Sequence, residues 1–224
     1  MAAEIVLPTP FSEFSASAIT GKVDGDLIDS WASTGTDTAA AGTTTQRPTY
    51  KTGVKNSLPA VRFASGCSLN AQWAATHGPV TLVTVHRLDT APSRSSIVSG
   101  PNSSTIGFQY DLVSGNQYVY GWGALNQTSN GSMNGATSTD WAISVIEFGG
   151  ANTRHNYNAV WGGSRTLTDG PAVAGFTMGA NRARSGQYFT GDIAHNGWYD
   201  GVLSRVQVSE LMKKLSDRYS IALV

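Results

Sequence analysis

The sequence is poor in charged residues and in cysteine, and each shortage excludes a class of protein. Its 224 residues include 15 basic and 15 acidic side chains, which leave no net charge at neutral pH. A nucleic acid-binding domain normally carries a basic excess or a basic cluster, so we expect no nucleic acid partner. The single cysteine, Cys67, cannot form a disulfide bond within the chain or a cysteine-rich zinc site. We interpret it as a small buried side chain.

Long apolar stretches are missing as well. No segment approaches the roughly 18 consecutive apolar residues that a membrane-spanning helix needs, so we expect no membrane insertion. The N-terminal sequence MAAEIVLPTPFSEF contains acidic residues and prolines where a signal peptide has a basic start and an apolar run. We therefore expect synthesis in a cytoplasm, without a signal peptide.

Glutamate is scarce, and the pattern that a glycosidase needs is absent. Only Glu147 falls within a predicted strand, and no acidic residue lies two or four positions away from it. Glycosidases place two carboxylates on either side of the bond that they cleave. The histidines show no metal-binding spacing, and no Gly-x-Ser-x-Gly sequence is present. We therefore predict a protein without enzymatic activity. The less favoured alternative is a polysaccharide hydrolase, or a lyase that uses a pair such as His195 and Tyr199.

What the sequence does contain is a series of short segments with strand patterns, separated by Gly, Ser, Thr and Asn. Residues 80–86 are β-branched and follow a Gly-Pro pair, and residues 106–112 alternate apolar and polar side chains. We count about ten to twelve such segments along the chain. Regular short strands with polar turns predict an all-β sandwich of two sheets.

One helix is predicted near the C-terminus. Ser204 and Gln207 have the spacing of a capping box, which starts a helix by satisfying free backbone N–H groups. The apolar stripe that follows, with the spacing of a helix face, consists of Leu211, Met212, Leu215 and Tyr219. We expect this stripe to pack on the sandwich.

No linker of distinct composition divides the chain, so we expect one large domain. Residues 1–25 have no sustained periodicity, and Pro8 and Pro10 favour an extended path. This segment is either an edge strand of the sandwich or an arm that docks on a neighbouring subunit. Residues 26–224 then form the sandwich itself.

Two sets of residues are candidates for binding. Asp24, Asp26 and Asp29 supply closely spaced oxygen ligands for calcium, although solvated turn residues are the simpler interpretation. Calcium is the one cofactor that we consider; otherwise we expect none. Aromatic side chains can stack on sugar rings or contact a protein, and the alternative is that they fill the core or an oligomer interface. The candidates are Tyr118, Tyr120, Trp122, Trp161 and Trp198.

Several short motifs resemble a known family. They are Trp31, Arg47-Pro48-Thr49-Tyr50, Pro59-Ala60-Val61-Arg62-Phe63, Gly179-Ala180-Asn181 and Phe189-Thr190-Gly191-Asp192-Ile193-Ala194. Together with Tyr199, the Leu203-Ser204 pair and Tyr219, they resemble the concanavalin A-like, laminin-G-like jelly-roll domains found in bacteriophage virion proteins. Two positions depart from that pattern. His195 stands where the family usually has Glu, and Asn158-Ala159 replaces an Asn-Gly hairpin.

The resemblance implies a two-sheet jelly-roll β-sandwich with one C-terminal helix. It also implies a non-catalytic protein of the virion surface, in capsid decoration, a head fibre or the tail. We expect partners such as the major capsid protein or tail proteins, a homo-oligomer, and attachment to a cell-surface glycan. The alternative is a carbohydrate-binding lectin module, calcium-assisted through the three aspartates. Fold alone does not decide between these functions.

Overall fold

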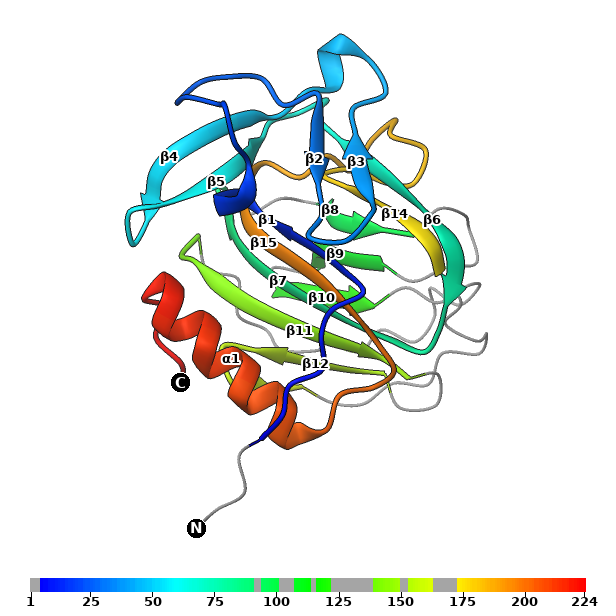
Figure 1. Cartoon of the computed structure of the whole chain (residues 1–224), viewed down its shortest axis with the longest axis vertical. Helices are drawn as coiled ribbons and strands as arrows, with labels where there is room; N and C mark the ends of the chain where they lie inside the picture. Colours follow the sequence, from blue (N-terminus) through cyan, green and yellow to red (C-terminus); the bar gives the residue numbers. More distant parts are fainter. Residues whose placement is uncertain are drawn as a thin grey trace.

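The computed structural model describes residues 5–90, 94–100, 107–113, 116–121, 139–149, 153–162 and 173–224. Two antiparallel sheets face each other, and one α-helix lies across the outside of the first sheet (Figure 1). Short 3-10 turns at Ala16–Ala18 and Thr44–Gln46 join some of the strands. The predicted all-β sandwich with a C-terminal helix is confirmed.

Sheet A contains eight strands in the order β13-β12-β11-β7-β15-β5-β4, with β1 paired to β15. These strands are β1 (Ser12–Ser15), β4 (Thr49–Lys55), β5 (Leu58–Phe63), β7 (Val80–Leu88), β11 (Ala142–Phe148), β12 (Arg154–Tyr157), β13 (Val160–Trp161) and β15 (Gly191–Asp200). Strand β15 pairs with β7 along one edge. Along its other edge it pairs first with β5 and then with β1.

Sheet B contains seven strands in the order β10-β9-β8-β14-β6-β3-β2. They are β2 (Ser30–Ala32), β3 (Thr38–Ala40), β6 (Leu69–His77), β8 (Arg94–Ser99), β9 (Gly107–Val113), β10 (Asn116–Gly121) and β14 (Val173–Met178). Sequence neighbours often lie in different sheets, so the chain crosses between the layers repeatedly.

An aromatic cluster fills the space between the sheets. Trp198 from sheet A stacks on Phe176 from sheet B with ring centroids 5.2 Å apart, and Trp73 meets Trp198 edge-on at 5.1 Å. Phe14 of β1 contacts Phe176 at 5.4 Å. Large apolar rings dominate the burial free energy of a core, so this cluster holds the two layers together.

A second apolar layer lies between the outer face of sheet A and helix α1 (Arg205–Tyr219). The stripe predicted from the sequence is buried there against Val83, Val85 and Val145. At the start of the helix, the Ser204 hydroxyl accepts a hydrogen bond from the Gln207 N–H, and the Gln207 side chain accepts one from the Ser204 N–H. The predicted capping box is therefore present. Within the described residues, no helix has the length and apolarity to cross a membrane.

Strand β15 can occupy the middle of sheet A only because glycine begins it. Gly191 has a φ of 154°, and a Cβ atom there would lie 2.0 Å from the carbonyl oxygen of Arg87. Any side chain would push β15 away from β7. The glycine thus permits the close approach that brings the next residue, Asp192, beside the side chains of both neighbouring strands.

We expect Ser204→Ala to lower the free energy of unfolding by about 1 kcal/mol, because the first turn of α1 loses its capping acceptor. Urea unfolding of both proteins measures the difference. Ser209→Ala, at an exposed position of the same helix, is the control and should change stability by less than about 0.5 kcal/mol. Equal stabilities of Ser204→Ala and the parent would contradict the capping role.

Candidate functional site

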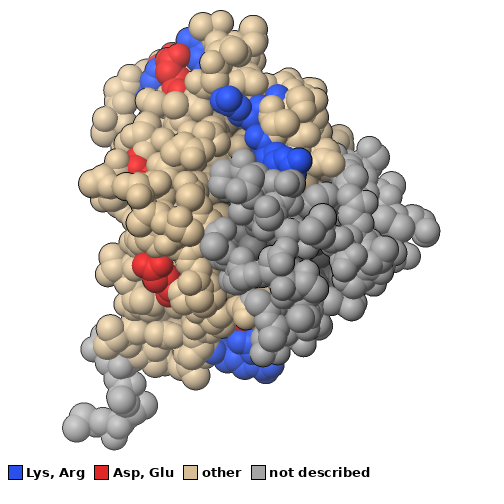
Figure 2. Space-filling view, turned by 90° about the vertical axis from the view of Figure 1, so that its right-hand side faces the viewer, with Lys and Arg blue, Asp and Glu red and all other residues tan. Residues whose placement is uncertain are grey.

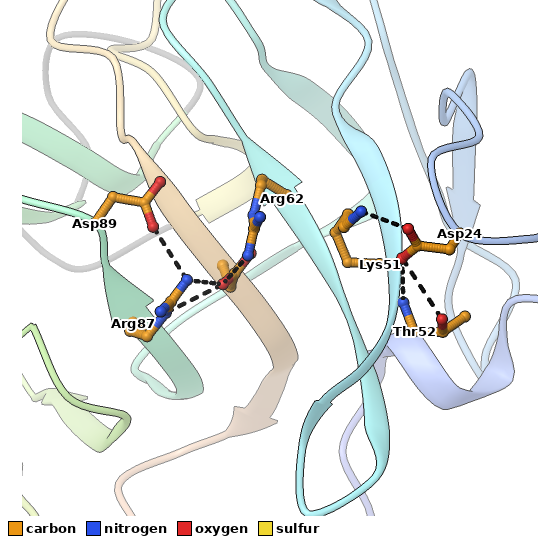
Figure 3. A network of polar contacts seen from close by, with 7 residues as sticks. Asp24, Lys51, Thr52, Arg62, Arg87 and Asp89 are labelled. Carbon is orange, nitrogen blue, oxygen red and sulfur yellow. Dashed lines mark hydrogen bonds and ion pairs between the residues drawn. The ribbon is translucent and has the colours of Figure 1, made fainter.

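Four charged side chains form one network on the outer face of sheet A, beyond the part that α1 covers (Figure 3). The register places Asp192 of β15 directly between Arg62 of β5 and Arg87 of β7. Arg62 donates from Nε to Asp192 Oδ1 (2.8 Å) and from Nη2 to Oδ2 (3.0 Å). Arg87 donates from Nη2 (2.6 Å) and Nε (3.1 Å) to Asp192 Oδ2. Arg87 Nη2 also donates to Asp89 Oδ1 at 3.1 Å.

Burial differs sharply within this network. The Asp192 side chain is 0% exposed, whereas those of Arg62 and Arg87 are 37% and 30% exposed. Removing a carboxylate from water costs several kcal/mol unless charged partners compensate for it, and here two guanidinium groups do so. The hydrogen bonds that Arg62 donates to Asp192 raise the pKa of the Arg62 guanidinium. Both guanidinium groups are therefore held in fixed positions at the surface.

The network leaves hydrogen-bonding groups directed away from Asp192. Among the described residues, none accepts a hydrogen bond from Nη1 of Arg62 or of Arg87. Asp89 is partly exposed, and half-buried Trp141 lies beside Arg87, with the guanidinium carbon 6.0 Å from its ring centroid. Two arginines and two aspartates cancel in charge. Donors, an acceptor and an apolar ring on one electrically neutral surface suit a polyhydroxylated ligand without charge.

A separate contact group lies on the neighbouring strand β4 (Figure 3). Asp24 accepts hydrogen bonds from Lys51 Nζ at 2.6 Å and from the Thr52 N–H at 2.9 Å. The Lys51 hydrogen bond is the main cause of the lowered pKa of the Asp24 carboxyl. This carboxylate is engaged in holding the loop before β2 onto β4.

The other two predicted metal ligands have partners elsewhere. Asp26 Oδ2 accepts from the Val23 N–H at 2.9 Å, and Asp29 Oδ1 accepts from Arg47 Nη1 at 3.0 Å. Asp24, Asp26 and Asp29 are not brought together, and the described part of the chain contains no group of His, Cys, Asp or Glu that can hold a metal ion. Calcium binding stays a prediction from the sequence, without a ligand set in the structure.

Of the predicted aromatic candidates, Trp198 needs correction. Its side chain is 1% exposed, it lies in the core between the sheets, and its Nε1 donates to Asn196 Oδ1 at 2.8 Å. A ring so enclosed offers no surface to a glycan or a protein. The alternation of β15 directs Trp198 inwards, so the core interpretation is the one that holds.

The remaining aromatic candidates have different surroundings. Trp161 is half-buried on edge strand β13, and the guanidinium carbons of Arg154 and Arg205 lie 5.2 and 5.3 Å from its ring centroid. Residues 118 and 120 belong to β10, but their side chains lie outside the described part of the structure, as does residue 122. The predicted binding role of Tyr118, Tyr120 and Trp122 stays a prediction.

Three side chains considered for catalysis are buried. Glu147 of β11 is fully enclosed, and Arg154 Nε donates to its Oε2 at 2.6 Å. Burial raises the pKa of the Glu147 carboxyl, and Arg154 acts in the opposite direction. His195 and Tyr199 share the outer face of β15 on either side of Gly197, and both are buried. Burial, and secondarily Arg218, lowers the pKa of His195 to about 4, while burial raises the pKa of Tyr199.

Sequence reasoning missed the charged network on sheet A. Arg62 and Asp192 are 130 positions apart, so no local motif joins them. A signal exists within each strand, because Arg62 alternates with Val61 and Phe63 and so must face away from the core. Only the pairing of β5, β15 and β7 shows that these outward charges meet.

No protein-family model matches this sequence, and no curated protein matches it significantly. Solved structures do share the fold. A mutant Trypanosoma rangeli sialidase displaying trans-sialidase activity is similar with a TM-score of 0.64 at 14% identity, over 96% of this chain and 34% of that chain. The T. rangeli sialidase in complex with sialic acid is similar with a TM-score of 0.54 at 14% identity, over 96% and 34%. This chain thus spans about a third of the sialidase chains.

A third similar structure is matched over its whole length. It is domain 4 of AbnA, a GH43 extracellular arabinanase from Geobacillus stearothermophilus, in complex with arabinotriose. The TM-score is 0.55 at 15% identity, and the match covers 92% of this chain and 100% of that chain. At these identities the likeness establishes the fold alone. It is a two-sheet sandwich that occurs in carbohydrate-active proteins, and none of these structures is a phage protein by its description.

The prediction of a protein without enzymatic activity is corrected by these similarities. Several of the similar structures come from sialidases and one from a GH43 arabinanase, so this fold occurs in enzymes that act on carbohydrates. The prediction rested on the absence of acidic residues close together in sequence. Residues 130 positions apart meet on sheet A, which shows that local spacing is an insufficient ground for excluding a catalytic group.

We expect Asp192→Asn to lower the free energy of unfolding by about 2 kcal/mol, because two guanidinium groups lose their shared counter-charge. The value is below that for a fully enclosed pair, since water reaches both arginines. Urea unfolding measures it, with Asp89→Asn as the matched control at less than about 0.5 kcal/mol. Equal effects of the two substitutions would show that the network does not depend on Asp192.

Stability should also depend on pH through His195. Its pKa is about 4 in the folded protein against 6.5 for a free side chain, so the unfolded state binds more protons between these values. The free energy of unfolding then rises with pH across this window, by up to about 1.4 kcal/mol per pH unit, and is lost as pH falls. Urea unfolding at about pH 5, 6 and 7 should show a shallower slope for His195→Gln than for the parent. Parallel slopes would contradict a buried neutral histidine.

Proposed function

We propose that this domain binds a neutral saccharide on the outer face of sheet A, through Arg62, Arg87, Asp89 and Trp141. One observation carries the proposal: a fully buried carboxylate fixes two partly exposed guanidinium groups, one of them beside a tryptophan. Each arginine keeps Nη1 directed away from that carboxylate.

The energetics favour a binding role for the network over a purely stabilising one. Replacing a buried ion pair by apolar side chains is often neutral or stabilising, so such a pair contributes little net stability. Its effect here is to hold two flexible side chains in single positions. Side chains ordered before binding do not lose that entropy when a ligand arrives, which improves affinity.

The chemistry of the exposed groups matches a sugar. A guanidinium edge donates two hydrogen bonds and a carboxylate accepts two, which suits neighbouring hydroxyls of a sugar ring. The Trp141 ring can pack on the apolar C–H face of the same sugar. Figure 2 shows one side of the molecule, where most of the coloured atoms belong to residues other than Lys, Arg, Asp and Glu.

The comparison with domain 4 of the arabinanase supports the ligand class, because that domain shares the fold and its structure holds arabinotriose. At 15% identity it does not indicate which residues bind. The residues proposed here rest on the geometry of this chain.

Wild-type protein should bind an oligosaccharide of a neutral glycan array, and Trp141→Ala should weaken that binding at least about ten-fold by removing the stacking surface. Titration calorimetry with the best array ligand measures the loss, and product analysis of the same mixture detects any cleavage. Asp89→Asn, which removes an acceptor charge without touching the core, should also weaken binding. Lys51→Ala on neighbouring β4 is the control. Equal affinities for all four proteins would contradict the proposed site.

We further propose, from the sequence resemblance, that the domain acts on the surface of a phage virion, with capsid or tail proteins as partners. Mass spectrometry of purified particles from the source culture tests this placement. A fixed copy number relative to the major capsid protein is expected, and absence from particles would contradict it.

A further inference from the structure

The charged network on sheet A is the middle of a longer row of side chains that crosses neighbouring strands in register. The row consists, in order, of Leu27, Thr49, Arg62, Asp192, Arg87 and Trp141. Trp141 is its last member because Ala142 pairs with His86, which puts the residue before Ala142 level with Arg87. Chain neighbours of the row, among them Tyr50, Phe63 and Ile193, lie in the core between the sheets. The row itself therefore faces outwards.

The row is open to water except at one position near its centre. Leu27 is 43% exposed, and the side chains of Arg62 and Arg87 are partly exposed. Thr49 and Trp141 are half-buried. Asp192 alone is enclosed, between the two guanidinium groups that it orders. Five of the six side chains thus present surface to a ligand.

The surrounding structure fixes the direction in which a ligand can extend over this face. Two positions farther along the strands, the face is closed by the apolar layer under α1, which includes Ala60, Val85, Ile143 and Ala194. In the opposite direction the strands end, since β5 stops at Phe63 and β15 begins at Gly191. The row is therefore the last one on the outer face of these strands. A long ligand that occupies it must run across the strands.

Apolar side chains stand at both ends of the row, and polar ones lie between them. A single exposed leucine is ordinary on a protein surface, but Leu27 lies in register with the groups of the proposed sugar site. A linear glycan offers hydroxyl groups along its edges and C–H groups on the faces of its rings. Hydrogen-bonding groups flanked by Leu27 and Trp141 match both features at several points along one chain.

We infer that the row binds an extended, linear neutral glycan that lies across the strands, with Leu27 and Thr49 contacting the sugar units farthest from Trp141. Neighbouring strands are about 4.8 Å apart, so the five steps of the row span roughly 24 Å. A sugar unit of an extended chain is about as long as one such step, so the row accommodates about five units. Binding of a sugar at Trp141 rests on the proposed function, whereas the length of the glycan and the roles of Leu27 and Thr49 rest on the row.

Titration calorimetry with arabino-oligosaccharides and cello-oligosaccharides of two to six units tests the inference. In the series that binds, affinity should rise with added units and level off at about five. Leu27→Ser removes apolar contact surface, so it should weaken binding of the six-unit sugar about five-fold and leave binding of the three-unit sugar unchanged. Thr49→Val should show the same dependence on length, whereas Trp141→Ala should weaken binding of both sugars.

Val206→Ser is the matched control for Leu27→Ser, because it also replaces an exposed apolar side chain, near the start of α1. This variant should bind the three-unit and six-unit sugars as the wild-type protein does. Circular dichroism and urea unfolding establish that each variant is folded.

The outcomes distinguish the row from the proposed function. Equal affinities for three and six units, lost in Trp141→Ala and unchanged in Leu27→Ser, would overturn the row and leave the site at Trp141. An equal loss of three-unit and six-unit binding in Leu27→Ser would contradict the placement of Leu27 at the far end. Binding of neither series to the folded wild-type protein would overturn the row and the proposed saccharide site together.

Discussion

The position of strand β15 in the middle of sheet A is the constraint on which the rest of the structure depends. Its inward side chains, among them Trp198, build the aromatic core between the sheets, and its outward side chains, such as Ala194 and Tyr199, support helix α1. Its edges pair with three different strands. Gly191 allows this crowding at the start of the strand, and Asp192 follows at once with the charge that orders Arg62 and Arg87.

The chain carries no net charge, and its main electrostatic interactions are those between neighbouring side chains. Asp192 is buried with two arginines, and Glu147 is buried with one. His195 is enclosed and neutral under α1, with a depressed pKa. Asp192 and Glu147 thus meet charged partners, whereas burial shifts the pKa of His195. Where the partners reach the surface, as Arg62 and Arg87 do, the same pairing that satisfies the buried group also presents ordered donors to a ligand.

The fold class could be predicted from the sequence, whereas the charged network on sheet A could not. Strand alternation, the Ser204 capping box and the apolar stripe ending at Tyr219 are local patterns, and the structure confirms them. The charged network depends on the pairing of three strands that are distant in sequence, which no local pattern encodes.

The predicted site residues show the same limit. The three aspartates that suggested calcium lie close in sequence but have separate partners. Trp198 was a binding candidate because it is aromatic. Side chains alternate between the two faces of β15, and this alternation places Trp198 in the core. Residue type alone was therefore a poor guide to exposure, which depends on the face of the strand that a side chain occupies.

Nuclear magnetic resonance of the arginine Nε–H and tryptophan indole N–H groups, recorded during titration with a neutral oligosaccharide, tests the central claim most directly. Our account predicts shifts for Arg62, Arg87 and Trp141, and an unchanged signal for the enclosed indole of Trp198. Saturable binding that leaves the Arg62, Arg87 and Trp141 signals unmoved would contradict it.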